Sequence, residues 1–348
     1  MQDDTLQAPA TIFDIAARAG VSIATADRAL NGRKGVAEKT REAVLEAARA
    51  LDWTPNPIAQ SLSRKSVVPL DVILPEPSSP FMDMLVRQVS GAAERFRAFR
   101  MAPTPVLVPE LDVAALAEAL LARKGRPQGV ALVGLQHPDI VAAIDALVAS
   151  GTPVVTLVSD VLGTRRTAYV GVDNTAAGRA AAVMAGRFTR HDPTPVMVLA
   201  GTALYTDIRE REAGFRALAA TRFPHLHCLP TVWDVETDAE SRTVARDLLH
   251  ARPDIGAIYV AGGGQAGVAQ AVEAAGRADE IVIVAHDVMG PLEDRLRAGT
   301  FDAAINQNPE MQVVKALDLL SRLGNLALAP TGTDHSPIDI RIAETLPA

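Results

Sequence analysis

The spacing of apolar residues changes character near residue 68. Before this point, apolar residues recur every three or four positions in short stretches, and no alternating strand pattern is present. Thr11 and Ser22 are suited to cap two helices that run to about Ala19 and Leu30, and a glycine that can end a helix follows each. A third stretch with helical spacing covers 37–51. The pattern predicts a small all-α head.

Beyond Pro69, short apolar runs alternate with longer amphipathic stretches. Continuous apolar strands that alternate with helices are typical of parallel sheets covered on both faces. The series is too long for one sheet and divides near Asp173, which predicts an α/β core of two doubly wound lobes with a cleft between them. The expected strands are 70–74, 104–108, 129–133, 153–157, 167–172, 195–200, 255–260, 281–285 and 301–305, and the expected helices are 82–98, 111–123, 138–149, 174–188, 207–220, 237–250, 265–275 and 309–322.

The formal net charge of −7 by itself argues against a nucleic-acid partner, but its distribution changes that interpretation. Residues 1–66 carry nine Lys and Arg against eight Asp and Glu, whereas the rest of the chain carries 25 against 33. An acidic body with a mildly basic head suits a protein that contacts phosphates at one end only.

The sequence also carries signs of its compartment. No apolar run approaches the roughly 20 residues that cross a bilayer, and the acidic, polar start lacks the pattern of a secretory signal. Cys228 is the single cysteine, so no disulfide can form within the chain, and we interpret it as an inert buried thiol rather than a nucleophile. We expect a cytoplasmic protein without a membrane partner.

Residues 11–32 have the layout of a helix-turn-helix. Ala16 is small enough for close approach of the second helix, Gly20 permits the turn and Val21 can fill the space between the helices. Thr25 and Arg28 then project from a second helix of the size that fits the DNA major groove. Any small three-helix bundle could show the same pattern, so it leaves the function open.

A longer match raises the specificity of this motif. Residues 11–65, with the segments VSIATADRALNG and TPNPIAQSL at ungapped spacing, resemble the head of the LacI family of transcription regulators, and the remaining chain resembles a type I periplasmic sugar-binding protein. The resemblance implies a helix-turn-helix DNA-binding domain over 1–55, a hinge helix and linker over 56–68, and a ligand-binding core over 69–348. Lobe 1 would comprise about 69–171 plus 302–330, and lobe 2 about 172–301 plus a C-terminal strand.

The resemblance also implies roles for residues in the head. Arg28 stands where a family arginine reads a guanine, to which its forked guanidinium is suited. Ile23 and Ala24 begin the recognition helix, and being apolar they can meet only thymine methyls or similar surface. Asp27 departs from the serine of many members, which leaves its role open. The implied phosphate contacts are Ser22, Thr25 and Asn31, although each could equally be a cap or part of a solvated face.

Residues 57–63 resemble the family hinge helix. A helix of this length cannot persist alone because nucleation is costly, so the resemblance implies that it orders on DNA beside its copy in a homodimer. Leu62 matches a leucine that wedges into the minor groove, and Asn56 and Ala59 are the other implied DNA contacts of this segment. Leu62 could instead pack on its own core. The operator would be a near-palindrome.

A ligand should lie in the cleft, at the carboxyl ends of the strands. The resemblance implies a sugar-clamping Arg211, with Arg209 as the runner-up, and makes Asp287 an acceptor for sugar hydroxyls. Arg211 and Asp287 could also form an ordinary ion pair. The other implied ligand contacts are Ser79, Phe81 and Met82 after the first strand, His137 on a further loop, Gly264 and Gln265 in the GGGQAG segment, and Gln307.

Together these features predict a sequence-specific transcription regulator without a cofactor or metal, most simply a repressor released when a sugar or polyol binds. GGGQAG replaces an Asn-Asp pair common in the family, so we expect an inositol-like polyol or a pentose rather than a hexose or purine. A ligand-dependent activator or a co-repressed regulator are alternatives. An enzyme is disfavoured because GxSxG, HExxH and P-loop motifs are missing, and a solute-binding receptor would leave residues 11–65 unexplained.

Overall fold

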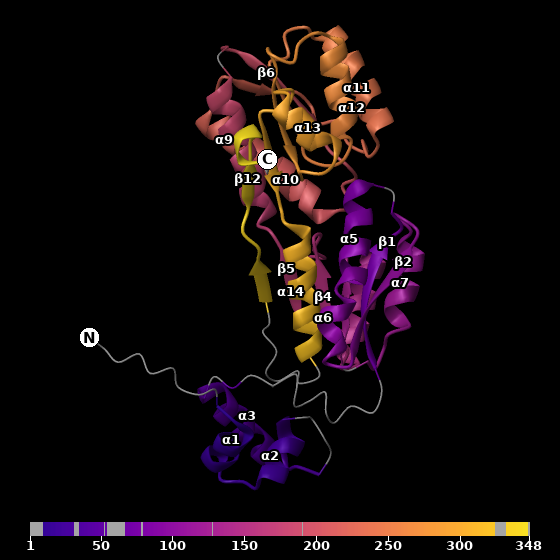
Figure 1. Ribbon diagram of the computed structural model, residues 1–348, viewed down its shortest axis with the longest axis vertical. Helices are drawn as coiled ribbons and strands as arrows, with labels where there is room; N and C mark the ends of the chain where they lie inside the picture. The colour runs from indigo at the N-terminus through magenta and orange to yellow at the C-terminus, as the bar shows by residue number, and fades with distance from the viewer. Residues whose placement is uncertain are drawn as a thin grey trace, which may run out of the picture.

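The computed structural model describes residues 10–30, 35–51, 53, 67–77, 79–126, 128–189, 191–323 and 332–346. In the head, α1 (Ile12–Ala19), α2 (Ile23–Leu30) and α3 (Glu38–Ala50) form a bundle around their own core, which includes Ile15, Ala26 and Val44 (Figure 1). Asp14 Oδ2 accepts a hydrogen bond from the Thr11 backbone N–H at 2.7 Å, an N-terminal capping interaction of the predicted kind.

The turn between α1 and α2 forms as its residues predict. Gly20 ends α1 in the left-handed conformation, with φ at 65°, which costs a glycine nothing. The Val21 N–H then donates to the Ala16 carbonyl oxygen at 3.0 Å, which fixes the change of direction. The helix-turn-helix is thus present in the described head.

The first lobe contains a parallel sheet of strand order β11-β5-β4-β3-β1-β2. Helices α5 and α14 pack against each other, as do α7 and α8. The elements are β1 (Val68–Pro75), α5 (Pro80–Gly91), α6 (Ala93–Arg97), β2 (Met101–Val108), α7 (Val113–Leu121), β3 (Val130–Leu132), α8 (Pro138–Ala149), β4 (Val154–Leu157), β5 (Ala168–Gly171), α14 (Pro309–Arg322) and β11 (Gly332–His335).

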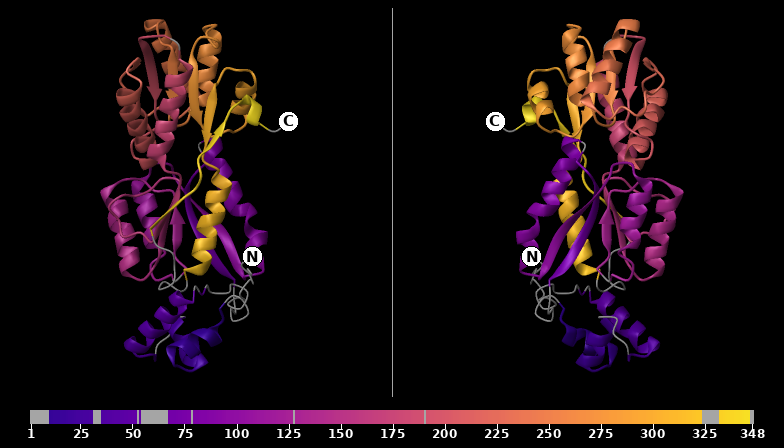
Figure 2. Two further views of the ribbon diagram at one scale, coloured as in Figure 1. Left: turned by 90° about the vertical axis from the view of Figure 1, so that its left-hand side faces the viewer. Right: turned by 90° about the vertical axis from the view of Figure 1, so that its right-hand side faces the viewer.

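The second lobe contains a sheet of strand order β12-β10-β9-β8-β6-β7, parallel except for the β10–β12 pair. Helix α9 packs on α10, and α11 on α12. The elements are α9 (Asn174–Phe188), β6 (Thr194–Leu199), α10 (Thr206–Arg222), β7 (Leu226–Cys228), α11 (Asp238–Ala251), β8 (Ala257–Val260), α12 (Gln265–Ala274), β9 (Val282–His286), α13 (Pro291–Arg297), β10 (Ala303–Asn306), β12 (Asp339–Arg341) and η2 (Ala343–Thr345). The two lobes follow one another along the long axis (Figure 2).

The chain passes between the lobes at three places within the described residues. It leaves lobe 1 after β5, returns between β10 and α14, and leaves again between β11 and β12. The second crossing corrects the expected boundary at residue 302: β10 pairs with β9 and belongs to lobe 2, so only α14 of this segment packs in lobe 1. A uniformly apolar strand suits either sheet, and its sequence does not show which strand it pairs with.

The strands that no apolar run predicted are edge strands of the two sheets. β11 is polar and exposed along its whole length, and in β7 only the first residue is fully buried. By contrast, all six residues of β6 are buried. Burial on both faces is what produces an apolar run, so these edge strands carry no such signal.

Candidate ligand cavity and DNA-reading helix

A cavity of about 260 Å³ lies between the lobes, close to the lower end of the usual range for small-molecule sites, about 300–1,000 Å³. Lobe 1 contributes the start of α5 and the residues after β2, β3 and β4, and lobe 2 contributes α10 and the residues after β8, β9 and β10. Every one of these strands ends at the cavity, which is where doubly wound sheets place their ligand sites.

Arg211 lies on the cavity wall from the second turn of α10, and its side chain is nearly inaccessible to solvent. Nε donates to Asn174 Oδ1 at 2.9 Å and Nη1 donates to the Ala261 carbonyl oxygen at 3.3 Å. Nη2 lies 3.4 Å from Asp207 Oδ2, an ion pair between successive turns of the helix. These three contacts hold the guanidinium in one orientation.

Two buried polar atoms at this point have no hydrogen-bond partner among the described residues: Asp207 Oδ1 and Arg211 Nη2. Both side chains line the cavity, and each residue is at least 95% buried. An unsatisfied buried polar group costs on the order of 1–3 kcal/mol. A ligand that supplied a hydrogen-bond donor to Asp207 and an acceptor to Arg211 would recover this cost, and a hydroxyl can do both.

Asp287 follows β9 with φ at 59°, a left-handed conformation that is uncommon for a residue other than glycine. Its Oδ2 accepts from Gln307 Nε2 at 2.9 Å and its Oδ1 from the Gln307 backbone N–H at 3.3 Å. Gln312 Nε2 in turn donates to the Gln307 carbonyl oxygen at 2.8 Å. Backbone strain of this kind gathers at ligand sites, and here it turns the carboxylate toward the cavity wall.

The electrostatics of the site come from burial. Desolvation raises the pKa of Asp207 and of Asp287, and the nearby Arg211 opposes both shifts. Desolvation, assisted by Arg211, lowers the pKa of His286 well below its ordinary value. His286 Nε2 pairs with the Tyr259 hydroxyl at 2.9 Å behind the cavity wall. Arg211 therefore stabilises the charged forms of Asp207 and Asp287.

Eight of the ten side chains expected at the ligand line this cavity. Phe81 and Met82 provide apolar surface, whereas Ser79 also has a structural role because its Oγ accepts from the Met82 N–H at 3.3 Å and caps α5. Gln265 Nε2 donates to two carbonyl oxygens, those of Gly262 and His286. The eight are Ser79, Phe81, Met82, Arg211, Gly264, Gln265, Asp287 and Gln307.

His137 and Arg209 do not line the cavity. His137 caps α8, since its Nδ1 accepts from the Asp139 N–H at 3.2 Å. Arg209 precedes Arg211 by two positions, which is about 200° around a helix, so the two arginines of the REREAGF segment face opposite sides. Of the two candidate sugar-binding arginines, Arg211 therefore faces the cavity and Arg209 does not.

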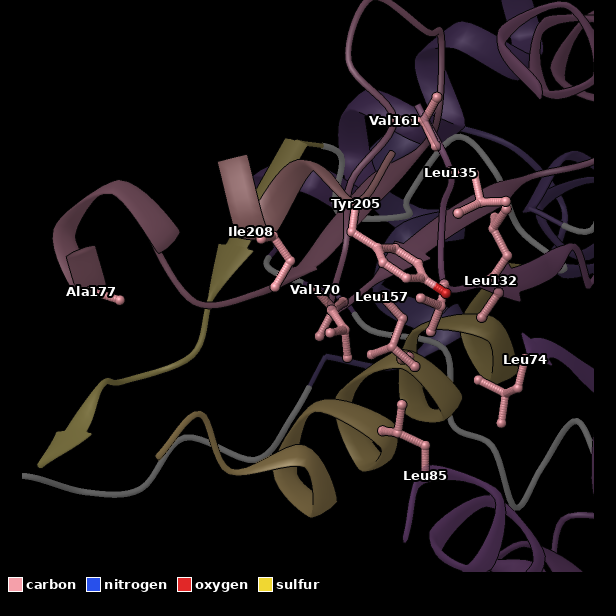
Figure 3. Packing of buried hydrophobic residues seen from close by; sticks show 14 of the residues in the cluster. Leu74, Leu85, Leu132, Leu135, Leu157, Val161, Val170, Ala177, Tyr205 and Ile208 are labelled. Carbon is pink, nitrogen blue, oxygen red and sulfur yellow. The ribbon is translucent and has the colours of Figure 1, made fainter. Parts of the chain in front are cut away.

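Several cavity residues escaped the sequence reasoning, among them Glu110, Tyr205, Asp207 and Glu236. The spacing of Asp207 and Arg211, four apart on a helix, was an available signal. Tyr205 carried none: its ring packs with the apolar side chains of lobe 1 such as Leu157 (Figure 3), although its helix belongs to lobe 2. Only the assembled fold brings it to the cleft.

In the head, α2 presents a mixed polar and apolar surface. Ser22, Ile23, Ala24 and Arg28 are exposed and Thr25 is half-buried, whereas Ala26, Ala29 and Leu30 face the bundle. Ser22 Oγ accepts from the Thr25 N–H at 3.1 Å and is the N-cap of the helix. The remaining expected DNA contacts, Asn31, Asn56, Ala59 and Leu62, lie outside the described residues, as does the whole expected hinge helix.

Two sequence families match the chain. The family of periplasmic binding protein domains matches residues 71–326, most of the chain, and the lacI family of bacterial regulatory proteins matches residues 11–56. The chain belongs to the family of periplasmic binding protein domains. The residues that match this family are those of the two-lobed core, as the resemblance of the sequence implied, and the lacI-family match is confined to the head.

Individual relatives match over shorter stretches. Catabolite control protein A of Streptococcus mutans is 37% identical over 95 residues, 27% of each chain. The ribose operon repressor of Halalkalibacterium halodurans is 37% identical over 86 residues, 25% of this chain and 26% of the repressor. The chain thus spans about a quarter of the length of the curated relatives it matches.

Solved structures resemble the core of this chain. A glucose-galactose binding protein from Geobacillus stearothermophilus has a TM-score of 0.71 at 21% identity, covering 82% of this chain and 100% of its own. A solute-binding protein from Burkholderia graminis in complex with D-arabinose has a TM-score of 0.73 at 18% identity, covering 81% and 97%. At such identities the likeness establishes the fold. Among the described helices, none is long and apolar enough to span a membrane.

Proposed function

We propose that the protein is a sequence-specific DNA-binding transcription repressor that leaves a near-palindromic operator when a sugar or polyol occupies the inter-lobe cavity. The observation that carries the ligand half of this proposal is that two buried atoms on the cavity wall, Asp207 Oδ1 and Arg211 Nη2, have no hydrogen-bond partner among the described residues. A ligand with hydroxyl groups satisfies both.

The DNA half of the proposal rests on α2. Its exposed Arg28 is suited to the O6 and N7 acceptors of guanine, and the neighbouring Ile23, 45% exposed, is suited to thymine methyls. The major groove would cover this exposed side chain. Ser22, Thr25 and Asn31 would hold the helix in register through phosphates.

The proposed domain division follows the sequence expectation, with β10 reassigned: a DNA-binding head over 1–55, a hinge over 56–68 and a two-lobed core from 69. In the proposed homodimer, Asn56, Ala59 and Leu62 of each hinge would contact the operator, and Leu62 would wedge into its centre. Ligand binding would change the arrangement of the lobes and separate the hinges. A nearly complete switch, from 1:99 to 99:1, requires a ligand preference of about 5.5 kcal/mol for the released state.

Two measurements test this function. Footprinting of the full chain on genomic fragments should reveal a protected near-palindrome, and protection at no preferred sequence would contradict the DNA half. Thermal-shift screening against pentoses, inositols and hexoses should reveal at least one compound that raises the melting temperature, because a ligand of the native state stabilises it. A ligand that strengthens operator binding would instead indicate a co-repressed regulator or a ligand-dependent activator.

A further inference from the structure

The charges on the wall of the cavity are strongly unbalanced. Its described lining includes five carboxylates and a single basic side chain. Arg211 forms the ion pair with Asp207 and also stabilises the charge of Asp287. Asp238 is exposed at the rim. Glu110 and Glu236 remain, and neither forms an ion pair with a described residue. The charge of Arg211 therefore compensates Asp207 and Asp287, whereas the charges of Glu110 and Glu236 are not compensated by a described basic residue.

Glu110 and Glu236 reach the cavity from opposite lobes. Glu110 follows β2 of lobe 1, and Glu236 precedes α11 of lobe 2. The Thr202 N–H donates to Glu236 Oε1, and Glu110 lines the same cavity as Tyr205. Both carboxylates are partly buried, and each keeps oxygen lone pairs for a further donor.

The two carboxylates repel one another across the cleft. Partial burial raises the pKa of Glu236, and the charge of Glu110 adds to the shift. Burial and the same two carboxylates raise the pKa of Tyr205. Like charges held in a partly desolvated site are unfavourable, and a cation between them would convert this repulsion into two attractive contacts.

A second observation points to a ligand in the same space. Asp207 Oδ1 and Arg211 Nη2 are buried and lack a hydrogen-bond partner among the described residues, and both side chains line the cavity. They favour a ligand with hydroxyl-type donors and acceptors next to Arg211. A metal ion does not meet this need, and the described residues contain no group of three or more His, Cys, Asp or Glu suited to holding one.

We propose that the ligand is a cationic polyol, an amino sugar or aminocyclitol, whose ammonium group lies between Glu110 and Glu236 while its hydroxyls meet Arg211, Asp207 and Asp287. An ammonium offers three donors, enough for both carboxylates, and these would be charge-assisted bonds. Because the two glutamates belong to different lobes, the ammonium would also draw the lobes together. The inference rests on the proposed function and specifies its ligand class.

Matched pairs of compounds test the proposal by calorimetry on the full chain: glucosamine with glucose, galactosamine with galactose, and scyllo-inosamine with scyllo-inositol. At least one amine should bind tenfold or more tightly than its neutral partner. In that pair, E110Q and E236Q should each reduce the affinity for the amine at least tenfold and change that for the neutral compound less than twofold. Glu118→Gln, an exposed control on α7, should change neither affinity.

Folding of each variant is checked by its thermal melt. Neutral members that bind as tightly as the amines, an amine affinity unchanged in both cavity variants, or no binding by any amine at millimolar concentration would overturn the inference. A neutral sugar that binds through Arg211 at least as tightly as every amine would leave the proposed function standing while removing this ligand class. Loss of sequence-specific DNA binding, by contrast, would contradict the proposed function alone.

Discussion

Gly178 on α9 lies directly against the backbone of Arg211 on α10: a Cβ atom at Gly178 would lie 1.9 Å from the Arg211 carbonyl oxygen. The approach is reciprocal, because a Cβ at Gly214 would lie 2.3 Å from the Thr175 carbonyl oxygen. Two glycines therefore let α9 and α10 come close enough for Asn174 to orient the Arg211 guanidinium. The helix pair that leads the chain into lobe 2 also positions the cavity's single arginine.

Gly178→Ala should disturb both stability and the cavity. The contact is with backbone, so the helices must separate, and overpacking of this kind costs about 1–3 kcal/mol or more. Urea unfolding should show this loss, and ligand affinity should fall with it. Gly91→Ala is the control: it lies at the end of α5 with nothing within 4 Å of its added Cβ, so it should be neutral or stabilise by about 0.5–1 kcal/mol. Equal stability of the two variants would refute the close packing.

Arg211→Lys should weaken the ligand at least tenfold, which corresponds to about 1.4 kcal/mol. Lysine retains a charge beside Asp207, but it lacks the fork that bonds Asn174 and Ala261 while presenting Nη2 to the cavity. Calorimetry with a ligand found by thermal shift measures the change. Arg209→Lys is the matched control, because Arg209 is outside the cavity lining. A larger effect at Arg209 would reverse our assignment of the clamp.

Arg28→Ala should reduce discrimination between the operator and scrambled DNA by about 1–3 kcal/mol, the value of one good bidentate base contact. Competition binding at fixed salt provides the measurement, since nonspecific affinity varies with salt. Arg49→Ala removes an equal charge from an exposed position of α3 and should leave discrimination unchanged. If specificity survives the loss of Arg28, another residue reads the bases.

His286 should make the core less stable in mild acid. Its lowered pKa means that the unfolded chain takes up a proton near pH 6.5 while the folded core does not. The free energy of unfolding therefore falls as the pH drops below about 6.5. His286→Gln should make this slope shallower by up to about 1.4 kcal/mol per pH unit, and exposed His250→Gln should not. The raised pKa values of Asp207 and Asp287 give the opposite dependence of stability on pH. They do so equally in the wild type and in both variants, so their effect cancels in the comparison. If the free energy of unfolding of the wild type and of His286→Gln depended on pH in the same way, this would contradict the lowered pKa of His286.

The extent of prediction differs between the fold and the site. A strand that is buried along its whole length, such as β6, is predicted by its apolar run, and Gly20 predicts a turn, because local sequence decides both. Asp287 and Gln307 were expected at the cleft because they follow strands that end there and because the family resemblance implied them, and both line the cavity. Glu110 and Tyr205 were not, since their meeting depends on which lobe each element joins. His137 was misplaced because a capping histidine before a proline looks, in sequence, like a residue exposed on a binding loop.

The most direct test measures how ligand binding in the cavity changes operator binding by the head, in one titration. The full chain is bound to its footprinted operator, and a cavity ligand is added while fluorescence anisotropy of the DNA is followed. The account predicts that the ligand releases wild-type protein, and that Asp287→Asn binds the operator with unchanged affinity but stays bound at the same ligand concentrations. A cavity ligand that leaves operator affinity of the wild type unchanged would contradict the central claim that the cavity controls the head.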